Sequence, residues 1–230
     1  MVVTTDANGN KVSYTYDANG QLLTTTNEAG DVTSYTYDAN GLMTSMTDVM
    51  GGKTVNTYDK VGNLVSTTDP MGHTTSYAYN ANNAVASVTD PAGGTVSYAY
   101  NANGQLASAT DANGGTTSFT YDKNGNQASV TDAEGNTTSY TYDKLDRLTQ
   151  LKDGRGNVTK YTYDNEGSQT SDTNGEGEKQ SMVYDALGRM TALTDRNGHT
   201  WSYVYDADGR MTAAKDPLGS TTGYTYDENG

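Results

Sequence analysis

The stretch SYTYDANGQLLTTTNEAG, residues 13–30, is followed directly by DVTSYTYDANGLM, residues 31–43, so that the motif Tyr-x-Tyr-Asp recurs after 21 residues. The same interval separates every later occurrence of the motif or of its variants. A fixed period of about 20 to 50 residues is the signature of a tandem-repeat protein, in which each unit packs only against its neighbours. The second tyrosine marks the phase, at Tyr16, Tyr37, Tyr58, Tyr79, Tyr100, Tyr121, Tyr142, Tyr163, Tyr184, Tyr205 and Tyr226.

The fixed period indicates that residues 1–230 form a single array of about eleven repeats. A constant period is stronger evidence of domain organisation than an estimate from chain length. Met1 falls in the phase that Leu22 and Met43 occupy, and Gly230 ends the last repeat one residue short of a full period. Neither end shows the atypical capping repeat that a free-standing array needs. We therefore expect this chain to be a segment of a longer array.

Tyrosine supplies most of the large side-chain surface that this chain has available for packing. Only 33% of the residues are hydrophobic, and beside 19 tyrosines there are one phenylalanine and one tryptophan. Such a chain is too poor in aliphatic residues for a conventional core, whereas each tyrosine is able to bury roughly 200 Å². We expect the tyrosines to be buried or half-buried in the wall of the array, with aliphatic partners beside them.

Each period contains two turn signals, one after the tyrosines and one after a threonine-rich run. Both have Asp at the first position and Gly at the fourth, as in DANG at 17–20 and DPMG at 69–72. This pattern predicts a type I turn followed by a glycine of positive φ. Such a combination is typical of the connections in β-hairpins. Asn83 and Asp146 replace the glycine and are residue types that tolerate a positive φ. Residues assigned to these turns include Asp17, Asp38, Gly20, Gly30, Gly51 and Gly72.

The segments between turns are about seven residues long and rich in Thr, Tyr, Val and Ser, so each repeat is predicted to form two short strands. The predicted fold class is all-β, an antiparallel strip of hairpins. The alternative is a parallel β-solenoid with 21 residues in each coil. In the antiparallel strip the cross-strand pairs are Tyr16–Leu22, Tyr37–Met43, Tyr58–Leu64, Tyr100–Leu106, Tyr142–Leu148 and Tyr205–Met211.

An odd period conflicts with strict alternation, because it moves the tyrosines to the opposite face of the sheet in each successive repeat. One β-bulge per repeat restores the parity. Apolar residues three apart in the second strand, such as Leu148 and Leu151, favour a bulge between the second and fifth residues after the first turn. With that bulge, Leu193 lies opposite Trp201.

The runs YTYDKLDRLTQLKDGRGNVTKYTYD at 140–164 and MVYDALGRMTALTDRNGHTWSYVYDADGRMTAAKDPLG at 182–219 resemble the YD repeats of the RHS family, whose signature is Tyr-Asp-x-x-Gly-Arg-Leu. Arg147, Arg189 and Arg210 match the arginine of that signature. The resemblance implies a β-strip that spirals into a hollow shell, as in polymorphic toxins, insecticidal toxin complexes and teneurins. In bacterial members the shell encloses a toxic C-terminal domain that is released by self-cleavage at a terminal core motif.

This sequence has neither the toxin nor that core. DPLG at 216–219 is similar to part of the core, but DPMG and DPAG occupy the same phase, so we interpret it as a turn variant. Repeats of constant length make an elongated superhelix or fibre the alternative to a closed shell.

No residue is assigned a catalytic role, and the chain is predicted not to be an enzyme. It has no cysteine nucleophile, and its two histidines, His73 and His199, occupy equivalent turn positions in distant repeats. The carboxylate pairs Asp206 with Asp208 and Asp143 with Asp146 are explained by turn chemistry. No cofactor is expected; Ca²⁺ at the Asp-rich turns is a minor alternative, because the turns lack the distal Glu of an EF-hand.

The net charge of −14 argues against nucleic acid, and no apolar run approaches the roughly 20 residues that span a bilayer. Absence of cysteine fits a reducing compartment or an exported bacterial surface protein. Because the sequence resembles the RHS family, we expect an extracellular or cell-surface location. We also expect its partners to be flanking repeats or domains of the same polypeptide. Sequons at Asn136 and Asn157 leave glycosylation open.

Two functions remain open. The first is a structural scaffold, a segment of wall that encapsulates or displays another domain. The second is an extracellular fibre or adhesin that self-assembles and binds glycans through a tyrosine-rich face. Accessibility of the tyrosines discriminates between them, since burial favours the wall and exposure favours the adhesin.

Overall fold

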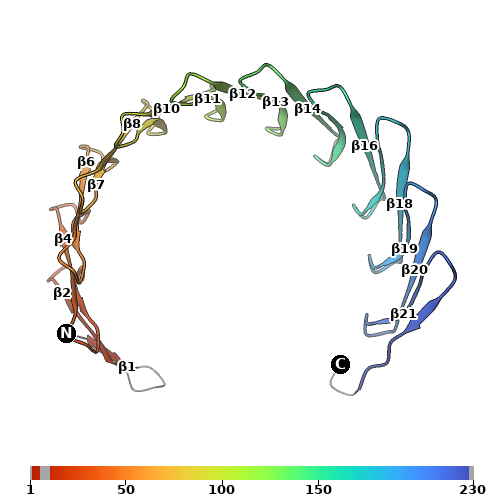
Figure 1. The fold of residues 1–230 in the computed structure, drawn as a ribbon, viewed down its shortest axis with the longest axis horizontal. Coiled ribbons are helices and arrows are strands. Elements are labelled where there is room, and N and C mark those ends of the chain that lie inside the picture. The colour runs from red at the N-terminus through yellow and green to blue at the C-terminus, as the bar shows by residue number, and fades with distance from the viewer. Residues whose placement is uncertain (1, 6–10, 228–230) are drawn as a thin grey trace. The chain divides into compact units, whose positions relative to one another are not determined.

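The structure is a computed structural model that describes residues 2–5 and 11–227, and all regular elements of these residues are β-strands (Figure 1). Met1, Gly9 and Gly230 lie outside the described residues. In chain order the strands are β1 (Val2–Thr5), β2 (Lys11–Tyr16), β3 (Leu22–Thr26), β4 (Val32–Tyr37), β5 (Met43–Thr47), β6 (Lys53–Tyr58), β7 (Leu64–Thr68), β8 (Thr74–Tyr79), β9 (Val85–Thr89), β10 (Thr95–Tyr100), β11 (Leu106–Thr110), β12 (Thr116–Tyr121), β13 (Gln127–Thr131), β14 (Thr137–Tyr142), β15 (Leu148–Lys152), β16 (Val158–Tyr163), β17 (Gln169–Thr173), β18 (Lys179–Tyr184), β19 (Met190–Thr194), β20 (Thr200–Tyr205), β21 (Met211–Lys215) and β22 (Thr221–Gly223).

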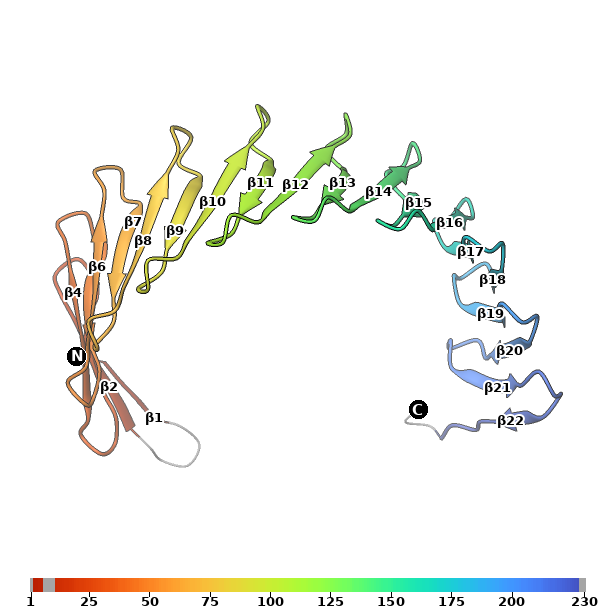
Figure 2. The same cartoon turned by 45° about the horizontal axis from the view of Figure 1, so that its top comes forward.

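The chain divides into two compact units, residues 1–116 and 117–230, and the division falls at the first residue of β12. In the first unit each strand from β1 to β11 pairs antiparallel with the next along the chain. In the second unit the strands from β12 to β22 do the same. Figure 2 shows the hairpins of each unit side by side in a single layer. The alternative of a parallel solenoid is therefore wrong, because consecutive strands return through tight turns and run antiparallel.

The predicted bulge is present at the same place in ten hairpins. In the first of them Tyr16 lies opposite Leu22 and Thr15 lies opposite Thr24, so Leu23 is the extra residue. Equivalent shifts follow in the hairpins that begin with β4, β6, β8, β10, β12, β14, β16, β18 and β20. The extra residue restores the parity that an odd period removes, so the tyrosines stay on one face. All six predicted tyrosine pairs are confirmed, as is the pair of Leu193 with Trp201.

The turns have the predicted chemistry. Asp17 N–H donates to the Gln21 carbonyl at 2.9 Å, and Gly20 N–H donates to the Asp17 carbonyl at 3.2 Å. Asp17 Oδ1 accepts the N–H groups of Asn19 and Gln21, both at 2.8 Å, so the carboxylate organises its own turn. Gly20 has φ of +85°, and the substitutes Asn83 and Asp146 have φ of 59° and 60°. The other assigned glycines, Gly30, Gly51 and Gly72, also have positive φ, and Asp38 repeats the bonds of Asp17.

The sheet has two unlike faces, which β8 illustrates. Thr75, Tyr77 and Tyr79 are half-buried, whereas Thr74, Ser76 and Ala78 on the opposite face are exposed. We call the first the tyrosine face; it also carries the aliphatic partners of the motif tyrosines. The second is a hydroxyl face, on which Thr and Ser bond across the hairpins, as Thr57 does with Ser66 at 2.6 Å.

Neither unit contains a hydrophobic core of the ordinary kind. Among the described residues only Met182, Ser45, Ser171 and Asp172 are buried. The motif tyrosines are half-buried, except that Tyr16 and Tyr226 near the two ends of the described chain are 43% and 40% exposed. Packing is therefore confined to contacts between neighbouring strands of one layer.

Replacing Gly51 by Val tests the turn assignment. We expect a loss of about 1–2 kcal/mol in the free energy of unfolding, because Gly51 has φ of +84° and a β-branched residue is strained there. The control is Met50→Val in the same turn, where the side chain is 92% exposed. Urea unfolding followed by circular dichroism measures both, and equal midpoints for the two variants would contradict the assignment.

Candidate functional site

Successive hairpins are in contact along the chain, and in seven of these contacts the second motif tyrosine forms a hydrogen bond to the preceding repeat. Between β5 and β6 the backbone ladder has three register pairs, ending at Ser45 and Val55. Beyond that end, the hydroxyl of Tyr58 donates to the carbonyl of Met43 at 2.8 Å. Met43 itself lies opposite Tyr37, the motif tyrosine of the preceding repeat. The Tyr58 side chain thus continues the connection where the backbone ladder stops.

The same bond recurs along both units, and we call the set the tyrosine ladder. Each donor is 15 residues after its acceptor, so every bond joins adjacent repeats. One such bond contributes about 0.5–1.5 kcal/mol net. Beside Tyr58, the ladder comprises Tyr79 to Leu64, Tyr100 to Val85, Tyr142 to Gln127, Tyr163 to Leu148, Tyr205 to Met190 and Tyr226 to Met211, at 2.7–3.0 Å.

In the seven repeats whose tyrosine belongs to the ladder, the hydrogen bond explains why the second motif position is tyrosine, whereas the first position varies. Asn56, Phe119 and Met182 occupy the first position, two residues before the motif tyrosine. A phenylalanine packs as well as a tyrosine but has no hydroxyl to donate. Partial burial also raises the pKa of Tyr142 and of Tyr163, which keeps both hydroxyls protonated as donors.

Three repeats add an arginine to this contact. In one of them Arg189 Nε donates to Asp185 Oδ2 at 2.7 Å, and its NH1 donates to the Asp206 carbonyl at 3.0 Å. The guanidinium carbon lies 4.9 Å from the centre of the Tyr205 ring. We call this arrangement of Asp, Arg, next-repeat Tyr and next-repeat carbonyl an arginine clamp.

Arg147 has the same four-part arrangement, and Arg210 has the contacts with the turn Asp and with the next-repeat Tyr. Arg147 binds Asp143 at 2.7 Å and the Asp164 carbonyl at 2.9 Å, and lies 4.7 Å from the Tyr163 ring centre. Arg210 binds Asp206 at 2.9 Å and lies 5.0 Å from the Tyr226 ring centre. The sequence predicted that these arginines match a family signature but missed their role. The spacing of Asp at i, Arg at i+4 and Tyr at i+20 is the signal that identifies it.

The clamps also affect the pKa values of their aspartates. The backbone N–H of Arg189 lowers the pKa of Asp185, burial raises it by less, and the guanidinium hydrogen bond and charge lower it further. The same causes, in the same order, lower the pKa of Asp206 beside Arg210. Both carboxylates are therefore ionised at any pH above their ordinary value of 3.8.

The residues considered for chemistry are engaged in their own turns. His73 and His199 lie in separate units, and each Nδ1 meets the turn carboxylate four residues earlier, Asp69 at 3.0 Å and Asp195 at 3.2 Å. Their side chains are 55% and 60% exposed.

Every member of the two carboxylate pairs is bound by a neighbouring side chain. Arg210 binds both Asp206 and Asp208, and its single positive charge offsets one of their two negative charges. Asp143 binds Arg147, while Asp146 accepts from Asn124 at 2.8 Å and from Asn126 at 2.6 Å.

A buried carboxylate was not foreseen from the sequence. Asp172 occupies an aliphatic phase on the tyrosine face, opposite Tyr161, and is 7% exposed. It forms an ion pair with Arg196, which comes from the second turn of the following repeat. This pair is a further contact between adjacent repeats.

Within residues 2–5 and 11–227 no group of three or more Asp, Glu or His is placed to hold a metal ion. The same residues include no helix that is long and apolar enough to cross a membrane. A cluster of acidic side chains of that size is thus not present at the described turns.

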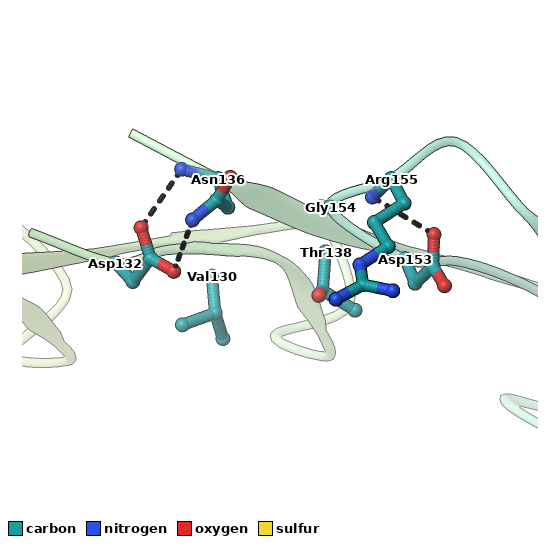
Figure 3. A pocket seen from close by; sticks show the side chains of 7 residues that line it. All are labelled: Val130, Asp132, Asn136, Thr138, Asp153, Gly154 and Arg155. Carbon is teal, nitrogen blue, oxygen red and sulfur yellow. Dashed lines mark hydrogen bonds between the residues drawn. The ribbon is translucent and has the colours of Figure 1, made fainter. Parts of the chain in front are cut away.

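A shallow hollow of about 430 Å³ lies between successive second turns of the second unit (Figure 3). Asn136 donates to both oxygens of Asp132, from N–H at 2.8 Å and from Nδ2 at 2.9 Å, and Arg155 N–H donates to Asp153 at 2.9 Å. Asn157 Nδ2 likewise donates to Asp153 Oδ2 at 2.8 Å. The carboxylates and amides here are engaged in hydrogen bonds of their own turns, and glycosylation of Asn136 and Asn157 stays a prediction.

Replacing Tyr79 by Phe tests the ladder. We expect a loss of about 0.5–1.5 kcal/mol, because the Leu64 carbonyl loses its donor. The matched control is Tyr77→Phe, which removes a hydroxyl from the same strand and face that makes no hydrogen bond within the described chain. Chemical denaturation of the two variants measures the difference, and an equal loss in both would refute the role of the ladder.

The clamps predict acid sensitivity. Asp185 and Asp206 have folded pKa values below 3.8, so their contribution to stability is complete above that pH and is lost as pH falls through the lowered values. We expect the urea midpoint to fall on going from about pH 5 to about pH 2.5.

The variant Asp185→Asn should lose less between the two pH values than the unchanged chain, because asparagine keeps the turn but does not titrate. Asp90→Asn, at a turn carboxylate with bonds only to its own turn, is the comparison. A pH dependence of Asp185→Asn equal to that of the unchanged chain would contradict the assignment.

Comparison with known proteins finds matches to family profiles and to solved structures. The family profile Teneurin YD-shell matches residues 92–229, and the profile RHS Repeat matches residues 2–31, 16–53 and 58–95. No curated protein sequence matches the chain.

Among solved structures, the crystal structure of TcdB2-TccC3 without its hypervariable C-terminal region superposes with a TM-score of 0.69 at 19% identity, over 99% of this chain and 14% of that one. TcdB2-TccC3-TEV gives 0.59 at 16% identity, over 96% and 16%. The Photorhabdus luminescens Tc holotoxin pore gives 0.52 at 16% identity, over 96% and 18%. The chain therefore spans less than a fifth of the length of these structures, and the likeness shows the fold.

Proposed function

Because the chain belongs to the RHS/YD-repeat family, we propose that it is a segment of the β-wall of an exported bacterial protein, which encloses or displays another part of the same polypeptide. The observation that carries the proposal is the tyrosine ladder. Its seven bonds join adjacent hairpins without a second layer, which supports a single sheet acting as a wall.

The arrangement of the polar groups supports a scaffold in preference to an enzyme. Turn carboxylates accept N–H groups of their own turns, the arginines bind across repeats, and the histidines are exposed beside turn carboxylates. A catalytic site needs a concave pocket with convergent groups, whereas the hollow of about 430 Å³ lies between turns whose carboxylates already accept N–H groups. The working residues are then the motif tyrosines with their turn Asp and Gly residues.

Likeness to Tc toxin structures supports the extracellular setting. Those structures are much longer than this chain, which accords with flanking repeats or domains as the partners of this segment. We propose an extracellular or cell-surface location on the same ground.

The glycan-binding fibre is not favoured. A sugar stacked on tyrosine rings would use their hydroxyls as hydrogen-bond partners, but seven motif hydroxyls donate to backbone carbonyls. The rings are also half-buried against neighbouring repeats, which reduces the face open to a ligand.

The proposal is tested on the native polypeptide that contains this chain. Its intact mass and terminal peptides are expected to reveal a non-repeating domain beyond the repeats. Protease is expected to cleave that domain only after the repeats are unfolded by urea, because an enclosed domain is inaccessible. A mass made up of repeats alone, or cleavage of the domain at the same rate before and after unfolding, would overturn encapsulation.

A further inference from the structure

One repeat has every part of an arginine clamp except the arginine. Ser168, which directly precedes β17, occupies the phase of Arg147 and Arg189. Asp164 stands where Asp143 and Asp185 stand in the clamps, four residues before that position. Tyr184, at the end of β18, provides the ring of the following repeat.

The place that a guanidinium would occupy is open. A hollow of about 510 Å³ is lined by Asp164, Glu166, Ser168, Tyr184 and Gly188, among others. In the next repeat, Arg189 NH1 lies 3.8 Å from the position of a Cβ on Gly209, the glycine equivalent to Gly188. Gly188 itself lines the hollow, together with Ser168 in the phase of Arg189 and Asp164 in the phase of Asp185. The hollow is therefore at the site that Arg189 fills one repeat later.

The groups around the hollow have unused capacity. Asp164 Oδ1 accepts the Ser168 N–H at 2.7 Å, and Oδ2 has no hydrogen bond within the described chain. The Tyr184 hydroxyl likewise makes no hydrogen bond there, unlike its seven counterparts in the tyrosine ladder. Asp164 and Glu166 give the hollow negative charge without a basic residue in its lining.

Other repeats without the arginine fill or lack this site. Gln21 Nε2 donates to the Gly41 carbonyl at 3.1 Å, and Leu42 lies 3.6 Å from the Cβ position of Gly62. Where the residue is as small as Ala84, the turn has Asn80 in place of the aspartate and so offers no carboxylate. Asn63 and Asn126 donate to the residues at the glycine position of the next turn, Asn83 and Asp146.

We propose that the hollow beside Ser168 is a binding site for a guanidinium group supplied from outside this chain. The carboxylate Oδ2 of Asp164 and the carbonyl of Asp185 accept its N–H groups, and the Tyr184 ring stacks on its face. A planar guanidinium suits this combination better than an ammonium, because it bonds in two directions within its plane and stacks on an aromatic ring. An arginine side chain of another polypeptide and a free alkylguanidine share this chemistry.

The test is titration of the 230-residue chain with ethylguanidinium chloride at constant ionic strength, followed by NMR of ¹³C-labelled tyrosine rings. The Tyr184 resonance is identified as the one missing from Tyr184→Phe. We expect it to shift saturably, with a dissociation constant on the order of 1 mM. Ethylammonium and the neutral ethylurea are the control ligands and should bind at least tenfold more weakly.

Two variants locate the site. Asp164→Asn should weaken binding at least tenfold, and Ser168→Arg should abolish it by placing a guanidinium in the hollow. Asp216→Asn, at a turn carboxylate of the same unit with bonds only to its own turn, should leave binding unchanged. Asp164→Asn retains the turn bond to Ser168, so it reports on the site even if Ser168→Arg fails to fold.

A second ligand distinguishes an arginine side chain from a small free cation as the source of the guanidinium group. This ligand is the peptide Gly-Arg-Gly, acetylated and amidated at its ends. Binding of this peptide at least as tight as that of ethylguanidinium assigns the site to an arginine side chain of a polypeptide. Binding of ethylguanidinium alone assigns it to a small free cation. No saturable shift of Tyr184, a shift retained in Asp164→Asn or Ser168→Arg, or equal binding of ethylammonium would overturn the proposal.

Discussion

A hydrogen bond from a tyrosine hydroxyl to a carbonyl of the preceding repeat is the constraint on which the rest of this structure depends. The backbone ladder between repeats ends after three register pairs, as at Ser45 and Val55, and the Tyr58 side chain continues the connection. In a sheet without a second layer or a buried core, such local contacts are what relate one hairpin to the next. The requirement for a hydroxyl explains why tyrosine, and not phenylalanine, occupies the second motif position in the seven repeats that form the ladder.

The bulge, the turn aspartate and the arginine each support this contact between repeats in a different way. The bulge at Leu23 and its equivalents keeps the tyrosines on one face despite an odd period. The turn aspartate accepts backbone N–H groups through one oxygen and, in three repeats, an arginine through the other. Ser168 shows that one component can be absent while the hairpin keeps its turn and register.

Much of the architecture followed from the sequence because it depends on local chemistry. Asp and Gly three residues apart specify the turn, and the parity of a 21-residue period requires the bulge, so the pair of Leu193 with Trp201 was predictable. The parallel solenoid also fits a constant period, and it was excluded only by the observed pairing. The arginine clamps were missed, because Arg147 meets the Tyr163 ring and the Asp164 carbonyl only when adjacent repeats pack in a definite register.

The sequence by itself determined the repeat, its two strands, its turns and the face on which the tyrosines lie. These features depend on residue type and on spacing within one period, where backbone sterics and side-chain alternation leave few choices. The tertiary structure decided where each hydroxyl and guanidinium finds its acceptor, and which position is left open beside Ser168. Those contacts join groups 15 to 17 residues apart on different hairpins, and their existence depends on how closely the hairpins approach, which no local rule specifies.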